Sequence, residues 1–125
     1  MANSKEESDD QQTLLHCDRL SVVRVSYDGR QAVRRWKDII RHPGAVVVLP
    51  LFEDDRICLI QNRRVSVDAT LLEAPAGTLT AGESPLTCAH RELQEETGLV
   101  AGKMQPLGWF YASPGKKDKK MHLFL

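Results

Sequence analysis

The chain has 125 residues, 42% of them hydrophobic, which is enough for one domain with a buried core. Its 17 basic and 17 acidic residues cancel, and this argues against a general nucleic-acid-binding protein, which would carry a basic excess. No apolar run approaches the length of a membrane span, and the N-terminus is polar rather than signal-like. The three cysteines form no metal or disulfide pattern, which favours reduced thiols in a cytoplasmic protein.

The N-terminal part of the sequence predicts a polar leader and two strands. Residues 1–12 lack large apolar side chains, so we expect a disordered leader there and one domain over residues 13–125. Residues 20–27 are β-branched and predict a strand, and Asp28-Gly29 is a hairpin signal. Residues 31–40 fit a returning strand or an amphipathic helical turn, and the hairpin signal favours the strand.

The middle of the chain predicts a buried strand and its neighbours. His42-Pro43-Gly44 is a break before the nearly continuous apolar run of residues 45–52, which is typical of a strand buried on both faces. Pro50 indicates a bulge or the end of that strand. The next segments predict, in order, a turn, the partner strand, a polar loop and a short strand: residues 53–55, 56–62, 63–70 and 71–74.

One helix is predicted over residues 85–97. Ser84 suits the N-cap, Pro85 suits the first helical position, and Gly98 suits a left-handed C-cap. The face expected to meet a sheet has helical spacing and contains Leu86, Ala89, Leu93 and His90. After the helix, the sequence predicts a strand, a turn, a basic run and the start of a last strand: residues 104–112, 113–115, 116–120 and 121–125.

Three carboxylates crowd the end of this predicted helix. Glu92 and Glu96 are four residues apart and share a face, with Glu95 beside them, at the negative end of the helix dipole. Arg91 offsets part of the repulsion because it lies four residues before Glu95, and a hard divalent cation such as Mg2+ or Mn2+ would offset the rest. A solvated acidic helix end would explain the carboxylates alone, but not the spacing of Gly77 and Glu83 before them.

The pattern from Gly77 to Leu99, G-x5-E-x7-R-E-L-x-E-E-x-G-L, resembles the signature of Nudix hydrolases. The resemblance implies an α/β fold: an α/β/α sandwich with a mixed sheet and an N-terminal antiparallel hairpin. It implies Mg2+-dependent cleavage of a nucleoside diphosphate linked to another moiety. Nudix domains usually continue beyond the last strand seen here, so we expect a truncated C-terminal part, or a core that a partner chain completes.

Three flanking pieces resemble the ADP-ribose pyrophosphatases of this family: residues 42–46 (HPGAV), 72–77 (LEAPAG) and 113–115 (SPG). They imply hydrolysis of ADP-ribose to AMP and ribose 5-phosphate. The alternatives are a Nudix hydrolase of a nucleotide sugar, a dinucleoside polyphosphate or an oxidised nucleotide, or a non-catalytic module that binds such a ligand. The resemblance also implies a homodimer, because the N-terminal hairpin of these relatives often exchanges between subunits.

The resemblance implies a role for each site residue. Glu92 and Glu96 would hold the metal, assisted by Glu95 and the backbone carbonyl of Ala76. Arg91 would orient these carboxylates, and Glu83 would support the loop or hold an outer metal through water. The implied catalytic set is Arg91, Glu92, Glu95 and Glu96. The implied substrate-binding set is Trp36, Arg63, Glu73, Ser113, Pro114 and Gly115.

Three of these roles have alternatives. Trp36 would stack on adenine or pack in a core. Of Arg63 and Arg64, one would lie near the pyrophosphate and the other on the surface. The general base would be Asp118, which is the only acidic residue after Gly98, a glutamate of the helix, or a residue outside this sequence.

Overall fold

The computed structural model describes residues 10–125. Most of the expected leader lies outside the described residues, and the first strand, β1 (Gln11–His16), begins within its last two positions. The described chain divides into two compact units. One contains residues 10–42 with Ala112–Lys119, and the other contains Pro43–Tyr111 with Lys120–Leu125.

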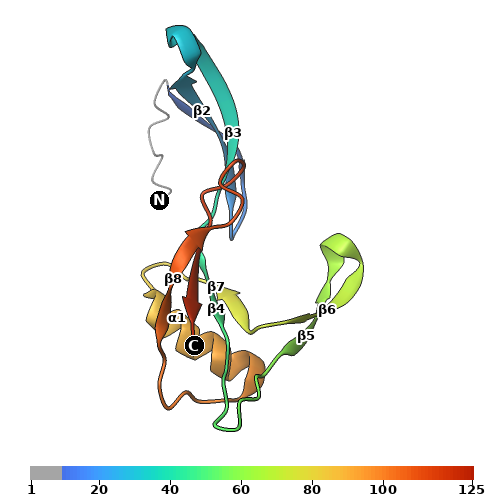
Figure 1. Cartoon of the computed structure of the whole chain (residues 1–125). Coiled ribbons are helices and arrows are strands. Elements are labelled where there is room, and N and C mark those ends of the chain that lie inside the picture. Colours follow the sequence, from blue (N-terminus) through green and yellow to red (C-terminus); the bar gives the residue numbers. More distant parts are fainter. Residues whose placement is uncertain (1–9) are drawn as a thin grey trace. The chain divides into compact units, whose positions relative to one another are not determined.

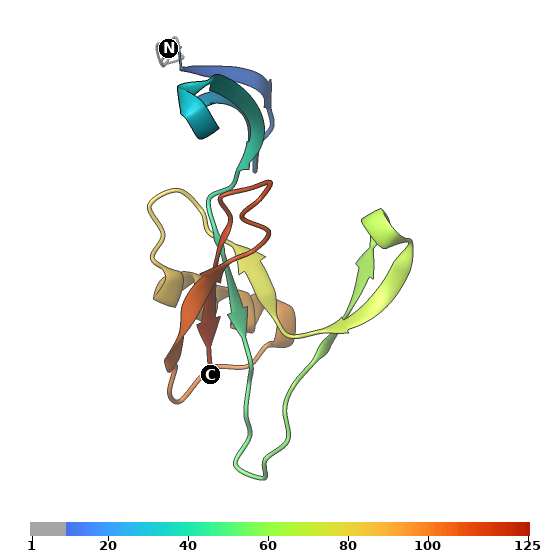
Figure 2. The ribbon, with the colours of Figure 1, turned by 45° about the horizontal axis from the view of Figure 1, so that its top comes forward.

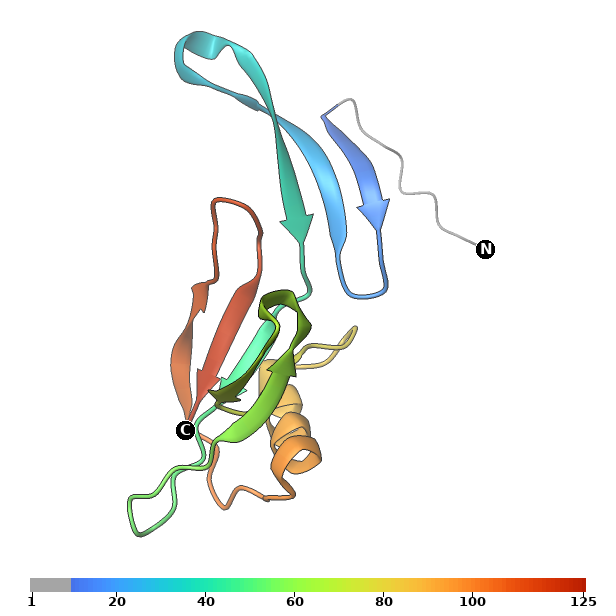
Figure 3. The same ribbon diagram turned by 90° about the vertical axis from the view of Figure 1, so that its right-hand side faces the viewer.

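The first unit is built on a three-stranded antiparallel sheet in the order β1-β2-β3 (Figure 3). Its other strands are β2 (Ser21–Asp28) and β3 (Arg34–Arg41). The predicted hairpin is confirmed, but its connection is longer than a two-residue turn because it contains the short 3-10 helix η1 (Arg30–Ala32). The strand predicted over residues 31–40 therefore starts only at Arg34.

A turn and a basic segment, residues 112–119, complete the first unit. The predicted turn at Ser113 is present, because the amides of Lys116 and Lys117 both donate to the Ser113 carbonyl. The segment then bonds to the end of β3: Ile40 N–H donates to the Lys116 carbonyl, and Asp118 N–H donates to the Ile40 carbonyl. These bonds hold residues 116–118 alongside Ile40.

The second unit contains the mixed sheet that the family resemblance implies. Its strand order is β7-β4-β9-β8 (Figure 2), and β4 pairs with β9 in parallel while the other pairs are antiparallel. The strands are β4 (Ala45–Val48), β7 (Ala76–Thr78), β8 (Pro106–Tyr111) and β9 (Lys120–Phe124). Val46 and Val48 are buried at the centre of this sheet, as a strand covered on both sides requires.

The predicted pairing of residues 45–52 with residues 56–62 is confirmed only next to the turn, where Leu51 and Ile57 form an isolated antiparallel bridge, and it does not continue along β4. β4 ends at Val48, before Pro50, and already has β7 and β9 as neighbours, so neither of its edges is open. β5 (Ile60–Arg64) pairs instead with β6 (Ala69–Glu73) in a two-stranded ribbon that extends away from the four-stranded sheet (Figures 1 and 2). The predicted loop over residues 63–70 is therefore mostly the ribbon and its tip, η2 (Val65–Val67).

The predicted helix is confirmed as α1 (Pro85–Thr97), capped by the Ser84 hydroxyl, which accepts from Thr87 N–H at 3.1 Å, and by Gly98 at φ 73°. Its expected buried face is only partly correct, because Leu86 and His90 are exposed. Cys88, Ala89 and Leu93 are buried instead. They pack in one core with Val46, Val48 and Phe124. This orientation brings Glu92, adjacent to Leu93, to the border of the core.

The described residues contain one α-helix, so the second helical layer of the expected sandwich is not among them. The mixed sheet and the antiparallel N-terminal strands are present as expected. No helix in residues 10–125 is long and apolar enough to cross a membrane.

Candidate active site

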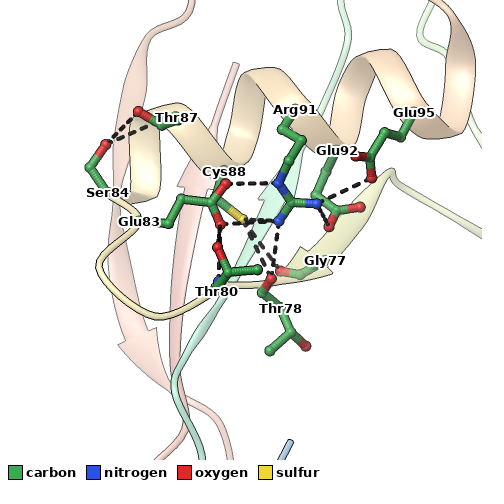
Figure 4. Close-up of polar contacts among 10 residues, drawn as sticks. All are labelled: Gly77, Thr78, Thr80, Glu83, Ser84, Thr87, Cys88, Arg91, Glu92 and Glu95. Carbon is green, nitrogen blue, oxygen red and sulfur yellow. Dashed lines mark hydrogen bonds and ion pairs between the residues drawn. The ribbon is translucent and has the colours of Figure 1, made fainter.

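Arg91 lies at the centre of a carboxylate cluster on α1 and the loop before it (Figure 4). Its Nε donates to Glu83 Oε1 at 2.8 Å, and its Nη1 donates to Glu92 Oε1 at 2.8 Å. Nη1 also reaches Glu95 Oε2 at 3.1 Å, the i, i+4 pair that the sequence predicts. The bonds to Glu83 and then Glu92 raise the pKa of Arg91, so the guanidinium is a permanent cation among three carboxylates.

Glu83 connects the loop before α1 to this arginine. Besides Arg91, its Oε2 accepts from the Thr80 N–H and the Thr80 hydroxyl, both at 3.0 Å. The Arg91 bond and then the Thr80 N–H bond lower the pKa of Glu83 to about 2. Glu83 is therefore ionised at any physiological pH and holds the loop against the helix.

Glu92 lies directly against the backbone of Gly77 in β7. A Cβ atom on Gly77 would lie 1.9 Å from Glu92 Cδ, so only glycine leaves room for this carboxylate. The Glu92 side chain is 12% exposed. Gly77, the first residue of the sequence pattern, thus leaves a pocket in β7 for the carboxylate of Glu92 in α1.

Glu96 lies one helical turn beyond Glu92 and bonds to the strand entry. Its Oε2 accepts from Ala76 N–H at 2.9 Å. Burial raises the pKa of Glu96, and the neighbouring charges of Glu92 and Glu73 add to the effect. The Ala76 amide and the charge of Arg64 oppose it. Glu96 is thus an ionisable group whose charge is only partly compensated.

Cys88 fills the space beneath the Arg91 guanidinium. Its Sγ lies 3.6 Å from Arg91 Nη2 and 3.8 Å from the Thr78 carbonyl oxygen. The side chain is fully buried, and burial raises the pKa of its thiol to about 11. Cys88 is therefore a packing residue and a weak donor rather than a nucleophile.

A second ion pair lies on the β5–β6 ribbon. Arg64 Nε donates to Glu73 Oε2 at 2.9 Å, and Arg64 Nη2 donates to Glu73 Oε1 at 2.5 Å. Asn62 Nδ2 approaches the same Glu73 Oε1 at 3.5 Å. The arginine bond lowers the pKa of Glu73, and the charges of both Arg64 and Glu73 act on Glu96.

The structure brings together the predicted site residues of the second unit except Arg63, and it places the others in the first unit. Residues that gather around α1 and the strand entry are Glu73, Ala76, Arg91, Glu92, Glu95 and Glu96. Trp36 and residues 113–115 belong to the first unit. Trp36 is half exposed rather than part of a core, and the Arg34 guanidinium lies 5.5 Å from its ring centroid.

Arg63, the arginine named in the predicted substrate set, bonds to the exposed Asp68. Arg64 is the arginine that lies beside Glu73 and acts on Glu96. Sequence reasoning left Arg63 and Arg64 as alternatives and named Arg63 in the substrate set, and it missed Asn62 and Cys88. The signal was strand alternation: residues 62 and 64 lie on one face of a strand, but residues 63–70 were interpreted as a loop.

The residues around Glu92 and Glu96 suit a hard divalent cation. In residues 10–125, no three aspartate, glutamate, histidine or cysteine side chains form a ready-made metal cage; the carboxylates bond to Arg91 and to the Ala76 amide. However, the donors are carboxylate oxygens four residues apart on one helix face, which are the ligands that Mg2+ and Mn2+ take. The Gly77 pocket gives Glu92 its place among them.

Comparison with known proteins agrees with this geometry. The chain is 43% identical over 89 residues to an ADP-ribose pyrophosphatase of Bacillus subtilis (strain 168), covering 71% of this chain and 48% of the relative. It is 37% identical over 107 residues to a methanol dehydrogenase activator of Bacillus methanolicus, covering 86% and 57%. The chain thus spans about half the length of these curated relatives.

A solved structure described as an ADP compounds hydrolase matches the fold with a TM-score of 0.78 and 25% identity. The match covers 92% of this chain and 63% of the solved one. A family model of the NUDIX domain matches residues 41–125, which include β7, the loop before α1 and the whole carboxylate cluster. The chain therefore belongs to the NUDIX domain family.

Proposed function

We propose that this protein hydrolyses ADP-ribose to AMP and ribose 5-phosphate with the help of Mg2+. The observation that carries the proposal is the arrangement of Glu92 and Glu96, one in the pocket at Gly77 and the other on the Ala76 amide. Relatives named as ADP-ribose pyrophosphatases, including one from Mycobacterium tuberculosis that is 34% identical over 90 residues, support the choice of substrate.

Glu92 and Glu96 would hold the metal, with Glu95 and the backbone carbonyl of Ala76 as further ligands. Bound there, Mg2+ would neutralise diphosphate charge and lower the pKa of water. Arg91 would hold Glu92 and Glu95 in place through its bonds to them at 2.8 and 3.1 Å. Mn2+ has the same ligand preference and is a second candidate.

For the diphosphate itself, the sequence left Arg63 and Arg64 as alternatives and we named Arg63; the contacts of the two side chains favour Arg64. Arg64 lies within electrostatic reach of Glu96, whereas Arg63 bonds to Asp68. A guanidinium offers two parallel donors to phosphate oxygens. Trp36 remains our predicted contact for adenine, and residues 113–115 remain predicted substrate contacts. The indole of Trp36 is half exposed, and the Arg34 guanidinium lies 5.5 Å from its ring centroid, so stacking on adenine would use the ring surface that Arg34 leaves uncovered.

A different nucleotide derivative is the alternative substrate. One relative, a CMP-5'-(N-acetyl-N-hydroxy-3-aminopropyl)phosphonate hydrolase of Streptomyces rubellomurinus, is 29% identical over 106 residues. The carboxylate cluster would serve a phosphoryl group in either substrate, since neither Glu92 nor Glu96 distinguishes the attached moiety. A homodimer and a cytoplasmic location also remain predictions, the second resting on the three free thiols.

A product-release screen tests the proposal. The chain is incubated with Mg2+ and, in separate reactions, ADP-ribose, a nucleotide sugar, a dinucleoside polyphosphate and an oxidised nucleotide, and products are resolved by chromatography. We expect AMP to appear fastest from ADP-ribose and turnover to need the metal. The Glu96→Gln variant should lose this turnover. Faster cleavage of another substrate, or undiminished Mg2+-dependent turnover in Glu96→Gln, would contradict the proposal.

A further inference from the structure

Glu73 is surrounded in a way that does not suit a direct substrate ligand. It lies at the end of β6, opposite Ile60 of β5, and its side chain is 22% exposed. Both of its oxygens accept from Arg64, at 2.9 Å to Oε2 and 2.5 Å to Oε1. Asn62 adds a longer contact to Oε1 at 3.5 Å. A carboxylate bonded this way has little acceptor capacity left, and its negative charge repels phosphate.

Arg64, in contrast, keeps donor capacity and is the more exposed partner, at 46% against 22%. A guanidinium has five N–H donors, and the Glu73 bonds use only Nε and Nη2. The Nη1 group has no bond to Glu73. The partner of Arg64, Glu73, lies three residues before Ala76, whose N–H donates at 2.9 Å to Glu96, one of the two carboxylates expected to hold the metal.

We propose that Glu73 is a positioning residue for Arg64 rather than a substrate ligand. It fixes the guanidinium beside the Glu96 end of α1, so that the remaining N–H groups of Arg64 meet the diphosphate of the bound substrate. Asn62, on the same face of β5, supports Glu73. This inference rests on the proposed diphosphate chemistry of the site, and it replaces the substrate-binding role that the sequence suggested for Glu73.

The same ribbon supplies a matched control. Arg63 and Asp68 form another arginine–carboxylate pair only one residue along β5, with both side chains at least half exposed. Arg63 alternates with Arg64 along the strand and therefore lies on the opposite face of the ribbon. Asp68→Asn removes the charge of that pair, and Asn tolerates the left-handed backbone at this position (φ 51°).

A double-mutant cycle on the full chain tests the inference. Arg64→Gln, Glu73→Gln, the double variant and Asp68→Asn are compared by calorimetric binding of inorganic pyrophosphate with Mg2+, and by kcat and KM for ADP-ribose. Arg64→Gln should weaken pyrophosphate binding by about 10- to 100-fold, as for loss of a charge-assisted bond. Glu73→Gln should weaken it by about tenfold. The double variant should bind like Arg64→Gln, and Asp68→Asn like the wild type.

The outcomes separate three roles for Glu73: positioning Arg64, contacting the substrate directly, or only stabilising the fold. If Glu73 contacted substrate directly, the losses in the double variant would be additive. If Glu73 only stabilised the fold, the thermal midpoint would fall without a change in pyrophosphate affinity. Additive losses, unchanged affinity in Arg64→Gln, or no pyrophosphate binding by the wild type would overturn the proposal. Non-additive losses in pyrophosphate binding without any ADP-ribose turnover would refute the proposed substrate alone and leave the role of Glu73 standing.

Discussion

Glu92 Cδ lies where the Cβ of any residue larger than glycine at position 77 would have to be, only 1.9 Å from that ideal Cβ. The contact joins β7 to α1 and links the first residue of the sequence pattern to one of its carboxylates. Since a clash of this size must move either the strand or the Glu92 side chain, Gly77 controls where a candidate metal ligand lies.

We therefore expect Gly77→Ala to lower kcat/KM for the Mg2+-dependent reaction by about 100-fold, the cost of an ångström-scale displacement of a reacting group. Overpacking should also lower the free energy of unfolding by about 1–3 kcal/mol. Steady-state kinetics and urea unfolding measure the two effects. Gly102→Ala is the control, because a Cβ there meets nothing within 4 Å. A Gly77→Ala protein with wild-type activity would show that Glu92 need not lie in this pocket.

Removing the charge of Glu96 should raise thermal stability, although it should abolish activity. Its pKa is raised by burial, so the folded state binds its proton more tightly than the unfolded state does. Ionised Glu96 therefore costs stability, and the cost grows as the pH rises through its pKa. Glu96→Gln should be more heat-stable than the wild type in EDTA at pH 7, with a difference that shrinks below pH 4.

Mg2+ should reverse that order. An ion that binds only the folded state raises the midpoint of the wild type by mass action, while Glu96→Gln should gain little. Scanning calorimetry with EDTA and with Mg2+ gives both comparisons, and Glu53→Gln in an exposed turn serves as the control. An equal Mg2+ shift in the wild type and in Glu96→Gln would remove Glu96 from the metal site.

The sequence predicted the helix well and the ribbon poorly, for a physical reason. Helix α1 is marked by local signals, the Ser84 and Gly98 caps, that act within a turn of where they occur. The pairing of β5 with β6 lacks such a signal, because its turn at Val65–Val67 contains no glycine or proline and ends at Asp68 in the left-handed conformation. The ion pair of Arg64 with Glu73 depends on the register of β5 against β6, so it could not be predicted without that register.

In the site, too, contacts set by local spacing were predicted and contacts set by tertiary packing were not. The Arg91–Glu95 bond follows from i, i+4 spacing, and the sequence predicted it. The bonds of Glu83 to Arg91 and of Glu96 to the Ala76 amide depend on how the loop and β7 pack on the helix. Spacing alone carries no such packing information. For the same reason the helix was predicted to bury Leu86 and His90, when the core of Val46 and Val48 receives Cys88 and Ala89 instead.

Glu83 predicts a pH window for stability. Its pKa falls from an ordinary value of 4.5 to about 2 on folding, chiefly through Arg91. The stabilisation is therefore complete above pH 4.5 and is lost as the pH falls toward 2. Glu83→Gln keeps an acceptor for Thr80 but loses the charge, so it should unfold at a lower temperature than the wild type at pH 6. Thermal scans from pH 6 to pH 2 should show the two midpoints converging; a constant gap would place the cause elsewhere.

Asp118 is, beside a glutamate of α1, a candidate for the general base, and its contacts indicate a structural role. Its Oδ1 accepts from His42 N–H at 2.8 Å, and its Oδ2 accepts from Arg41 Nη1 at 3.2 Å. Both oxygens thus bind the end of β3. Asp118→Asn should lower the free energy of unfolding by up to about 1 kcal/mol, since the Arg41 pair is partly exposed.

Activity of the same variant separates the two roles of Asp118. Loss of a general base typically costs about 10²–10⁴-fold in rate, and it removes the acid limb of the pH–rate profile, where protonation of the base lowers the rate. We expect Asp118→Asn to keep kcat within about tenfold of the wild type, with an unchanged profile, because the carboxylate is engaged by His42 and Arg41. A larger fall in kcat with an altered acid limb would instead make Asp118 the base and require its bonds to β3 to open during turnover.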